Sequence, residues 1–519
     1  MNQHLMRAVR VTATKLKFEK KFEESTVKIN ESVAKAAFYY EKLRNVIEYQ
    51  DEHLFLKNAI KRIIKRHKVF ASPDIPKKLL RELVWAGYFK NDTLPTRYEE
   101  DIDQILKKYE FIKKNVRSGF LERKRINSIF LGLVACDIEN ILSPSVARTE
   151  FVNFAKDLIK NNIDLPSTQI SASELDIQID ISIEKLLFKA DYDQLFFKLF
   201  SKFYKEWPDI SKAQAAELSQ NFAKVFNLID LWITKNKESK VQKYTKKQLP
   251  VFFVIWNILS NNSDPEILFE SKQKISEVSR LFINSRSKEL VGKVMRATAK
   301  GIIFVLLTKT IFALLVELPY EYRILNKINY LALGINIILP PMILFITGFF
   351  IKTPGKQNNK KLIDMIESVI FNNNLPTKKL ISLKANPGKN YVLFNTIYLF
   401  LSITILTLVG WLLYTVDFNH VSIALFFVFV SLVSFLSFRT RATAKELEIE
   451  PNEDNIISGV FNFLLLPFVS IGKYLSDKWS DYNFMLFFWD FVVEAPLKTV
   501  IMVFESWLSF AREKREDFE

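Results

Sequence analysis

The sequence predicts an all-α protein, in which a helical cytoplasmic domain is followed by an α-helical multi-pass transmembrane domain. Long apolar runs without a formal charge lie in the last two-fifths of the chain. Residues 1–300 carry 53 Lys and Arg against 38 Asp and Glu, whereas the remainder carries 20 against 19. The first part also shows helical periodicity with turn signals and no alternation of strands with helices.

The expected cytoplasmic domain covers residues 1–300. One stretch in it, 177–183, has isoleucine at every second position, but without an evident partner strand we expect it to be helical. The net charge of +16 resides almost entirely in this domain. Such a surplus attracts anionic phospholipid or nucleic acid, and the absence of a nucleic-acid motif favours anionic phospholipid as the partner.

Two helices of this domain could present cations to lipid headgroups. Segment 54–70 is amphipathic, with one apolar and one basic face, although a basic face can also be merely solvated. A second helix begins at Asp264-Pro265 and is expected to continue as a juxtamembrane helix to Lys300 and into the first span. The headgroup candidates are Lys57, Lys61, Arg62, Lys65, Arg286, Lys293, Arg296 and Lys300.

Two transmembrane hairpins are expected. About 20 apolar residues are needed to cross the hydrocarbon. The first hairpin, 301–351, pairs Gly301–Val316, which contains Lys309, with Ile328–Ile351. The second, 391–438, pairs Tyr391–Val416 with Val421–Phe438 across a four-residue turn.

The charges of the loops predict the orientation. The loop between the hairpins, 352–390, holds eight lysines and is expected in the cytoplasm by the positive-inside rule. Arg439, Arg441 and Lys445 place the end of the second hairpin on the same side, whereas the turn 417–420 has no Lys or Arg. The N-terminus and the C-terminus are both expected to be cytoplasmic.

The C-terminal part, 439–519, allows several interpretations and leaves the number of spans between four and six. Segment 456–471 is short and contains Pro467, which suits a re-entrant or interfacial helix, or a thin span. Segment 484–510, before a charged tail, carries Asp490, Glu494 and Lys498 along one helical stripe. It is expected to be an interfacial amphipathic helix, or a span whose stripe lines a polar path with Lys309 and Glu317, or else a helix packed against the cytoplasmic domain.

Three phrases carry a resemblance to other proteins. They are the segments 315–321, 335–342 with its paired prolines, and 490–496. In these phrases the chain resembles an uncharacterised family of bacterial multi-pass membrane proteins with no assigned function. The resemblance implies a bacterial plasma membrane and assigns no site.

No catalytic motif, metal-binding pattern or cofactor fingerprint is evident among only 12 glycines, 4 histidines and 1 cysteine. A single cysteine, Cys136, also excludes an intrachain disulfide. The leading expectation is therefore a non-enzymatic, membrane-anchored scaffold or regulator that binds anionic lipid and protein partners. A transporter or channel using charged residues within the bundle is the alternative, and a membrane enzyme acting on lipid is the second alternative.

Overall fold

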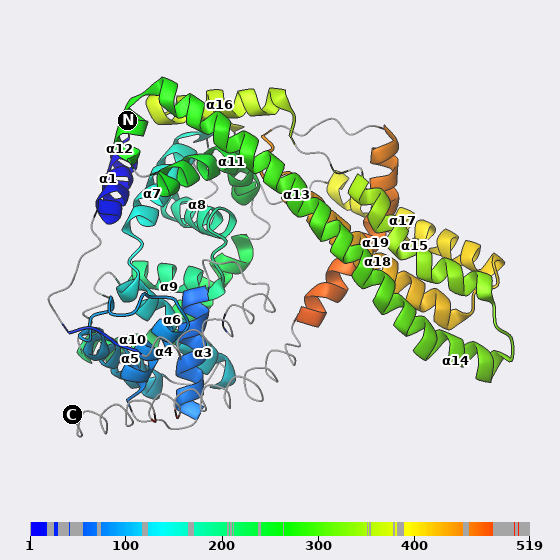
Figure 1. The fold of residues 1–519 in the computed structure, drawn as a ribbon, viewed down its shortest axis with the longest axis horizontal. Coiled ribbons are helices and arrows are strands. Elements are labelled where there is room, and N and C mark those ends of the chain that lie inside the picture. Colours follow the sequence, from blue (N-terminus) through cyan, green and yellow to red (C-terminus); the bar gives the residue numbers. More distant parts are fainter. Residues whose placement is uncertain are drawn as a thin grey trace, which may run out of the picture.

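The computed structural model is almost entirely helical, as predicted. It describes residues 2–17, 25–29, 41, 55–69, 74–116, 123–164, 171–204, 207, 210, 212–236, 240–262, 264–349, 351, 354–376, 379–380, 389–449, 456–480, 503 and 507. A helical N-terminal region and an elongated apolar bundle lie at opposite ends of one long helix, α13 (Lys272–Phe312), which crosses Figure 1 diagonally.

The N-terminal region contains two apolar cores. The first is formed mainly by α3 (Phe55–Val69), α4 (Ile75–Trp85), α5 (Tyr98–Asn115), α6 (Arg123–Leu142), α9 (Tyr192–Phe203) and α10 (Lys212–Asn236). The second is formed mainly by α1 (Gln3–Lys17), α7 (Val146–Asn161), α8 (Ala172–Leu186), α11 (Lys240–Asn261), α12 (Pro265–Glu270) and the start of α13.

Helix α8 explains the isoleucines at alternate positions. Ile181 packs in the first core, whereas Ile179 and Ile183 pack in the second. Because α8 lies between the two cores, it is apolar on more than one side and shows no single amphipathic stripe. Its start is set by the side chain of Ser171, which accepts a hydrogen bond from the backbone N–H of Glu174. The prediction of a helix is therefore confirmed.

Helix α13 joins the N-terminal region to the bundle without a break, as predicted. Its first half contributes Ile275, Ile283 and Leu290 to the second core, and its second half contributes Val305 to the bundle. The predicted helix start at Asp264-Pro265 is confirmed, but the helix that begins there is the short α12. The expected continuity from this start to Lys300 is wrong, because the helix breaks at Ser271 and α13 begins after it. Ser271 caps it by accepting from the backbone N–H of Lys274.

The bundle consists of the second half of α13 with α15 (Tyr330–Phe349), α17 (Lys389–Thr415), α18 (His420–Ala444) and α19 (Ile456–Ser480). Within the described residues, four helices are long and apolar enough to cross a membrane: α13 with its extension to Leu325, α15, α17 and α18. Helices α6 and α7 pass the same test only as one pair bent by 106°, and both pack into the N-terminal cores.

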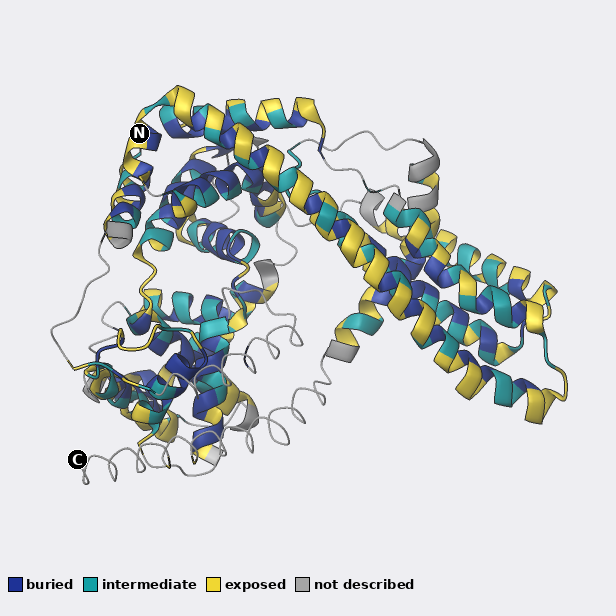
Figure 2. Cartoon of the chain, viewed as in Figure 1, coloured by how far each residue is buried: buried dark blue, intermediate teal, exposed yellow. Residues whose placement is uncertain are grey.

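Much of the outer surface of the bundle is exposed and apolar. Figure 2 shows long exposed stretches along these helices, and they include large side chains such as Phe394, Phe400 and Trp411 on α17. A water-soluble protein rarely exposes so continuous an apolar surface. The structure therefore suggests a membrane protein.

Helix α19 runs through Pro467 to Ser480 as one continuous helix. It lies closely against α18, because Gly472 has no side chain at the contact: a Cβ there would be 2.0 Å from the carbonyl oxygen of Ser431. Segment 456–471 is thus part of a longer helix that packs on α18. The following segment, 484–510, lies outside the described residues except for two single positions.

The segments that follow α15 and α18 return to the N-terminal region. Helix α16 (Lys356–Phe371), from the predicted loop 352–390, packs Leu362 and Ile366 into the second core. The two-residue strands β1 (Ile163–Asp164) and β2 (Lys379–Leu380) pair in parallel. At the opposite end of the bundle, the turns after Leu325 and after Thr415 face each other, since the amide of Asn329 donates to the carbonyl of Val416.

Candidate functional site

A cluster of buried polar side chains lies inside the apolar bundle. The ammonium of Lys309 on α13 is 2.5 Å from Oε1 of Glu317, and neither side chain is exposed. Asn336 on α15 donates from Nδ2 to Oε2 of Glu317 at 2.7 Å, and the hydroxyl of Ser422 on α18 donates to the same oxygen at 3.3 Å. Glu317 therefore connects three helices through its two carboxylate oxygens.

The local backbone brings Lys309 and Glu317 together. Residues Ala313–Glu317 form a π-helical turn, which contains more residues than an α-helical turn and so changes the direction of the residues that follow. The ammonium of Lys309 also lies 4.8 Å from the centre of the Phe429 ring on α18. The sequence identified both charged residues but not Asn336 or Ser422, although an amide in an apolar span is itself a signal of a helix contact.

A second polar group lies where the two turns of the bundle meet. Glu321, in the π-helical segment Glu321–Leu325, accepts from Nδ2 of Asn419 at 2.7 Å and from the backbone N–H of Asn329 at 3.0 Å. Asn419 also caps α18 by accepting from the backbone N–H of Ser422 at 2.8 Å. These bonds fix the two hairpins to each other at this end of the bundle.

Three buried oxygens of α15 and α18 have no hydrogen-bond partner among the residues that the structure describes. They are Oδ1 of Asn336 and the hydroxyls of Ser431 and Ser434 on α18. A buried polar atom without a partner costs about 1–3 kcal/mol. The bundle interior thus retains polar atoms that a bound group could satisfy.

The cations of α3 mostly contact acids of their own domain. Lys57 is almost completely buried and contacts Asp191 and Asp193, Lys61 lies 2.5 Å from Asp193, and Arg62 lies 2.5 Å from Glu41. Burial by itself lowers the pKa of Lys57, but Asp191 and Asp193 more than offset that effect and raise the pKa above its usual value. Lys57 is therefore not accessible to a lipid headgroup.

Lys65 is exposed on the same helix. On α13, Arg286 contacts Glu446 at 2.9 Å and Glu289 at 2.8 Å, and Lys293 contacts Glu289 at 2.7 Å.

The last two candidates, Arg296 and Lys300, are exposed one turn apart on α13, just before its apolar half. They hold the position expected of juxtamembrane cations. Their binding of lipid headgroups stays a prediction, as it does for Lys61, Arg62, Lys65, Arg286 and Lys293.

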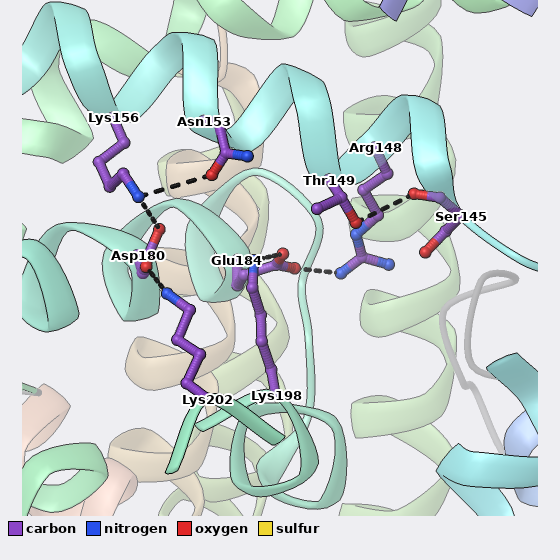
Figure 3. A network of polar contacts seen from close by, with 9 residues as sticks. All are labelled: Ser145, Arg148, Thr149, Asn153, Lys156, Asp180, Glu184, Lys198 and Lys202. Carbon is purple, nitrogen blue, oxygen red and sulfur yellow. Dashed lines mark hydrogen bonds and ion pairs between the residues drawn. The ribbon is translucent and has the colours of Figure 1, made fainter. Parts of the chain in front are cut away.

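A network of buried carboxylates holds α7, α8 and α9 together (Figure 3). Glu184 on α8 is bound by Arg148 of α7 and by Lys198 of α9, the latter at 2.5 Å. Burial alone raises the pKa of a carboxyl group, but the two cations outweigh it and lower the pKa of Glu184 to about 2. Asp180, one turn earlier, contacts Lys156 and Lys202 in the same way.

The predicted polar stripe of segment 484–510 cannot be placed, because Asp490, Glu494 and Lys498 lie outside the described residues. Among the positions that the structure describes, no group of three or more His, Cys, Asp or Glu side chains could hold a metal ion. Comparison of the chain with protein-family models, with curated proteins and with solved structures finds no match.

Proposed function

We propose that this chain is a multi-pass integral membrane protein of a bacterial plasma membrane, and that it acts without catalysis as a scaffold or regulator. In this proposal the bundle crosses the bilayer and the basic helical region lies on the cytoplasmic face, where it contacts anionic lipid and protein partners. The observation that carries the proposal is the continuity of α13, which belongs both to the second N-terminal core and to the apolar bundle.

The segments that follow α15 and α18 both lie against the N-terminal region, which supports this arrangement. Asn358 at the start of α16 donates to the carbonyl of Leu447 at 2.8 Å and accepts from the backbone N–H of Ile449 at 2.9 Å. The segments after α15 and after α18 thus bind each other and pack on the N-terminal region. These are the segments rich in Lys and Arg, which the positive-inside rule puts in the cytoplasm.

The complete burial of the Lys309–Glu317 pair favours a structural role over a path for transported solutes. Charges inside a bilayer are tolerated when they pair within the protein, and here both partners are fully enclosed. The pair joins α13 to α15 and α18 through Asn336 and Ser422. It therefore stabilises the anchor that holds the basic region at the membrane.

A transporter or channel is the second candidate. It is favoured by the unpartnered oxygens of Asn336 and Ser431, since a passing ion or polar solute would satisfy them. Such a protein would open the cluster to water during its cycle.

Two measurements test these proposals. Membranes that contain the full-length protein are washed with alkaline carbonate, and an integral protein remains in the pellet, whereas release into the wash would contradict the membrane proposal. A Cys136→Ala variant with Ser431→Cys is then exposed to a membrane-impermeant thiol reagent from each side. The scaffold predicts no labelling, whereas labelling that a solute prevents would favour transport and overturn the ranking.

A further inference from the structure

A cavity of about 1070 Å³ lies between the N-terminal region and the bundle. Its walls come from the end of α8, from α11, and from the domain-facing ends of α15 and α18 together with α19. Its volume is slightly above the range of about 300–1,000 Å³ typical of small-molecule sites. The apolar part of the wall includes Leu186, Leu187, Phe253, Leu465, Leu466 and Val469.

The polar part of the wall is strongly basic. Lys189, Lys243, Lys246 and Lys247 line it from the N-terminal region, and Arg439, Arg441 and Lys445 line it from the end of α18. The two carboxylates in the wall already have basic partners: Glu446 lies 2.9 Å from Arg286, and Glu448 lies 3.1 Å from Lys445. The cavity therefore has a surplus of positive charge.

Three of these lysines form one concentrated group. Lys243, Lys246 and Lys247 share a face of α11, because residues three and four positions apart lie side by side on a helix. All three are exposed, and no carboxylate among the described residues forms an ion pair with them. Cations gathered on one face repel each other, and a bound anion removes that repulsion.

The apolar and basic parts of the wall are arranged as an amphiphile requires. Phe438 precedes Arg439 at the point where the apolar run of α18 ends and its basic end begins, and both line the cavity. Deeper along α18, Ser434 also lines it, with a buried hydroxyl that has no partner in the described part of the chain. In the proposed orientation, this boundary lies at the level of the cytoplasmic headgroups.

We propose that the cavity is a binding site for one anionic phospholipid of the cytoplasmic leaflet. Its phosphate contacts Lys243, Lys246 and Lys247, and its acyl chains lie against the apolar side chains of α18 and α19. The lipid then connects α11 of the N-terminal region with α18 of the bundle. This inference rests on the proposed membrane location, and it adds a defined lipid site to the general attraction of a basic protein for an anionic surface.

The test compares two full-length variants that lose the same charge. The first is Lys243→Gln, Lys246→Gln, Lys247→Gln. The control is Lys77→Gln, Lys113→Gln, Lys224→Gln, which removes three exposed lysines of the N-terminal region outside the cavity. Each protein is purified in neutral detergent, and native mass spectrometry measures the binding of the first molecule of phosphatidylglycerol, of phosphatidylcholine and of inorganic phosphate.

The wild type and the control should bind the first phosphatidylglycerol at least about tenfold more tightly than phosphatidylcholine. The α11 variant should lose that preference, and millimolar inorganic phosphate should not displace the lipid. Equal preference in the α11 variant and the control would overturn the site in favour of diffuse attraction. Displacement by inorganic phosphate alone would assign the lysines to a free anion and would also overturn it.

The carbonate wash separates failure of this site from failure of the proposed function. If the α11 variant stays in the membrane and binds lipid like the control, the protein is integral and the lipid site is wrong. If the wild type itself is released by the wash, the membrane proposal fails, and the lipid site fails with it.

Discussion

Lys309 and Glu317 are both fully enclosed in the apolar bundle, and each is the only charged partner of the other among the described residues. Removing one partner of a buried ion pair leaves an uncompensated charge and costs about 3–5 kcal/mol, whereas replacing both costs far less. We expect Lys309→Met to destabilise the protein by about 3 kcal/mol. The thermal unfolding midpoint of the detergent-solubilised protein measures the change.

The double variant Lys309→Met, Glu317→Gln should recover most of that loss, since the amide of Gln keeps an acceptor for Asn336 without a charge. A double variant as unstable as the sum of its single variants would show that the two side chains act independently. That outcome would contradict the ion pair as a structural link.

Glu184 should make the stability of the protein depend on pH, because its pKa is lower in the folded protein than in the unfolded chain. An unfolded glutamate has a pKa of about 4.3, and the folded value is about 2. The bound carboxylate therefore contributes about 3 kcal/mol above pH 5, and this contribution is lost as the pH falls toward 2. The unfolding midpoint of the wild type should fall between pH 5 and pH 3 by more than that of Glu184→Gln.

Glu100→Gln is the matched control, because Glu100 is exposed at the start of α5 and should leave the pH profile unchanged. Profiles of the wild type and Glu184→Gln that run parallel from pH 5 to pH 3 would contradict the pKa assigned to Glu184. The prediction concerns stability alone and is independent of any function of the protein.

Single residues also show what the sequence could and could not predict. A charge in an apolar run is visible in the sequence, so Lys309 and Glu317 could be selected before their contact was known. Lys57 could not be separated from its neighbours on α3, since its partners Asp191 and Asp193 lie more than 130 positions away. From the sequence, the basic face of α3 was expected to be exposed, because the acidic residues that cover it come from a distant part of the chain.

At the scale of the element, the contact of α18 with α19 depends on a glycine. A Cβ at Gly472 would meet backbone atoms of Ser431, which cannot rotate away. Gly472→Ala should therefore force α19 away from α18 and destabilise the protein by about 1–3 kcal/mol. Thermal unfolding in detergent measures this change.

Gly459 provides the control in the same helix, because no atom of the described residues lies within 4 Å of a Cβ placed there. Gly459→Ala should be neutral or stabilising by up to about 1 kcal/mol, since alanine favours a helix. Similar destabilisation by both substitutions would mean that helix propensity or insertion, and not the α18–α19 contact, determines the effect of Gly472→Ala.

The helices themselves were largely predictable. Uninterrupted apolar runs predicted α15, α17 and α18, and the lack of a breaker between Lys272 and Lys300 predicted the continuity of α13. Helix α16 was not predicted, because the many lysines of 352–390 indicated a cytoplasmic loop. Only the structure places Leu362 and Ile366 among the side chains of the second core.

At the scale of the whole molecule, α13 acts as the axis of the arrangement. One end of it packs in the N-terminal region and the other in the bundle (Figure 1), and α16 and the segment after α18 also contribute side chains to the second core. The ends of the bundle differ in charge accordingly. The domain-facing end is basic, whereas the far end is formed by two short turns.

The two ends of the bundle are predicted to lie on opposite sides of the membrane, and single cysteines can test this orientation. Gln357 is exposed on α16 at the domain-facing end, and His420 is exposed at the far end of α18. Cys136 is buried, and burial raises the pKa of its thiol, so its replacement by alanine leaves each introduced cysteine as the reactive thiol.

The most direct test of the account is the labelling of these two positions in the Cys136→Ala protein with a membrane-impermeant thiol reagent. In intact cells, Cys at position 420 should react and Cys at position 357 should not. In inside-out vesicles the pattern should reverse. Reaction of both positions from the same side would contradict a bundle that crosses the bilayer with the basic region on its cytoplasmic face.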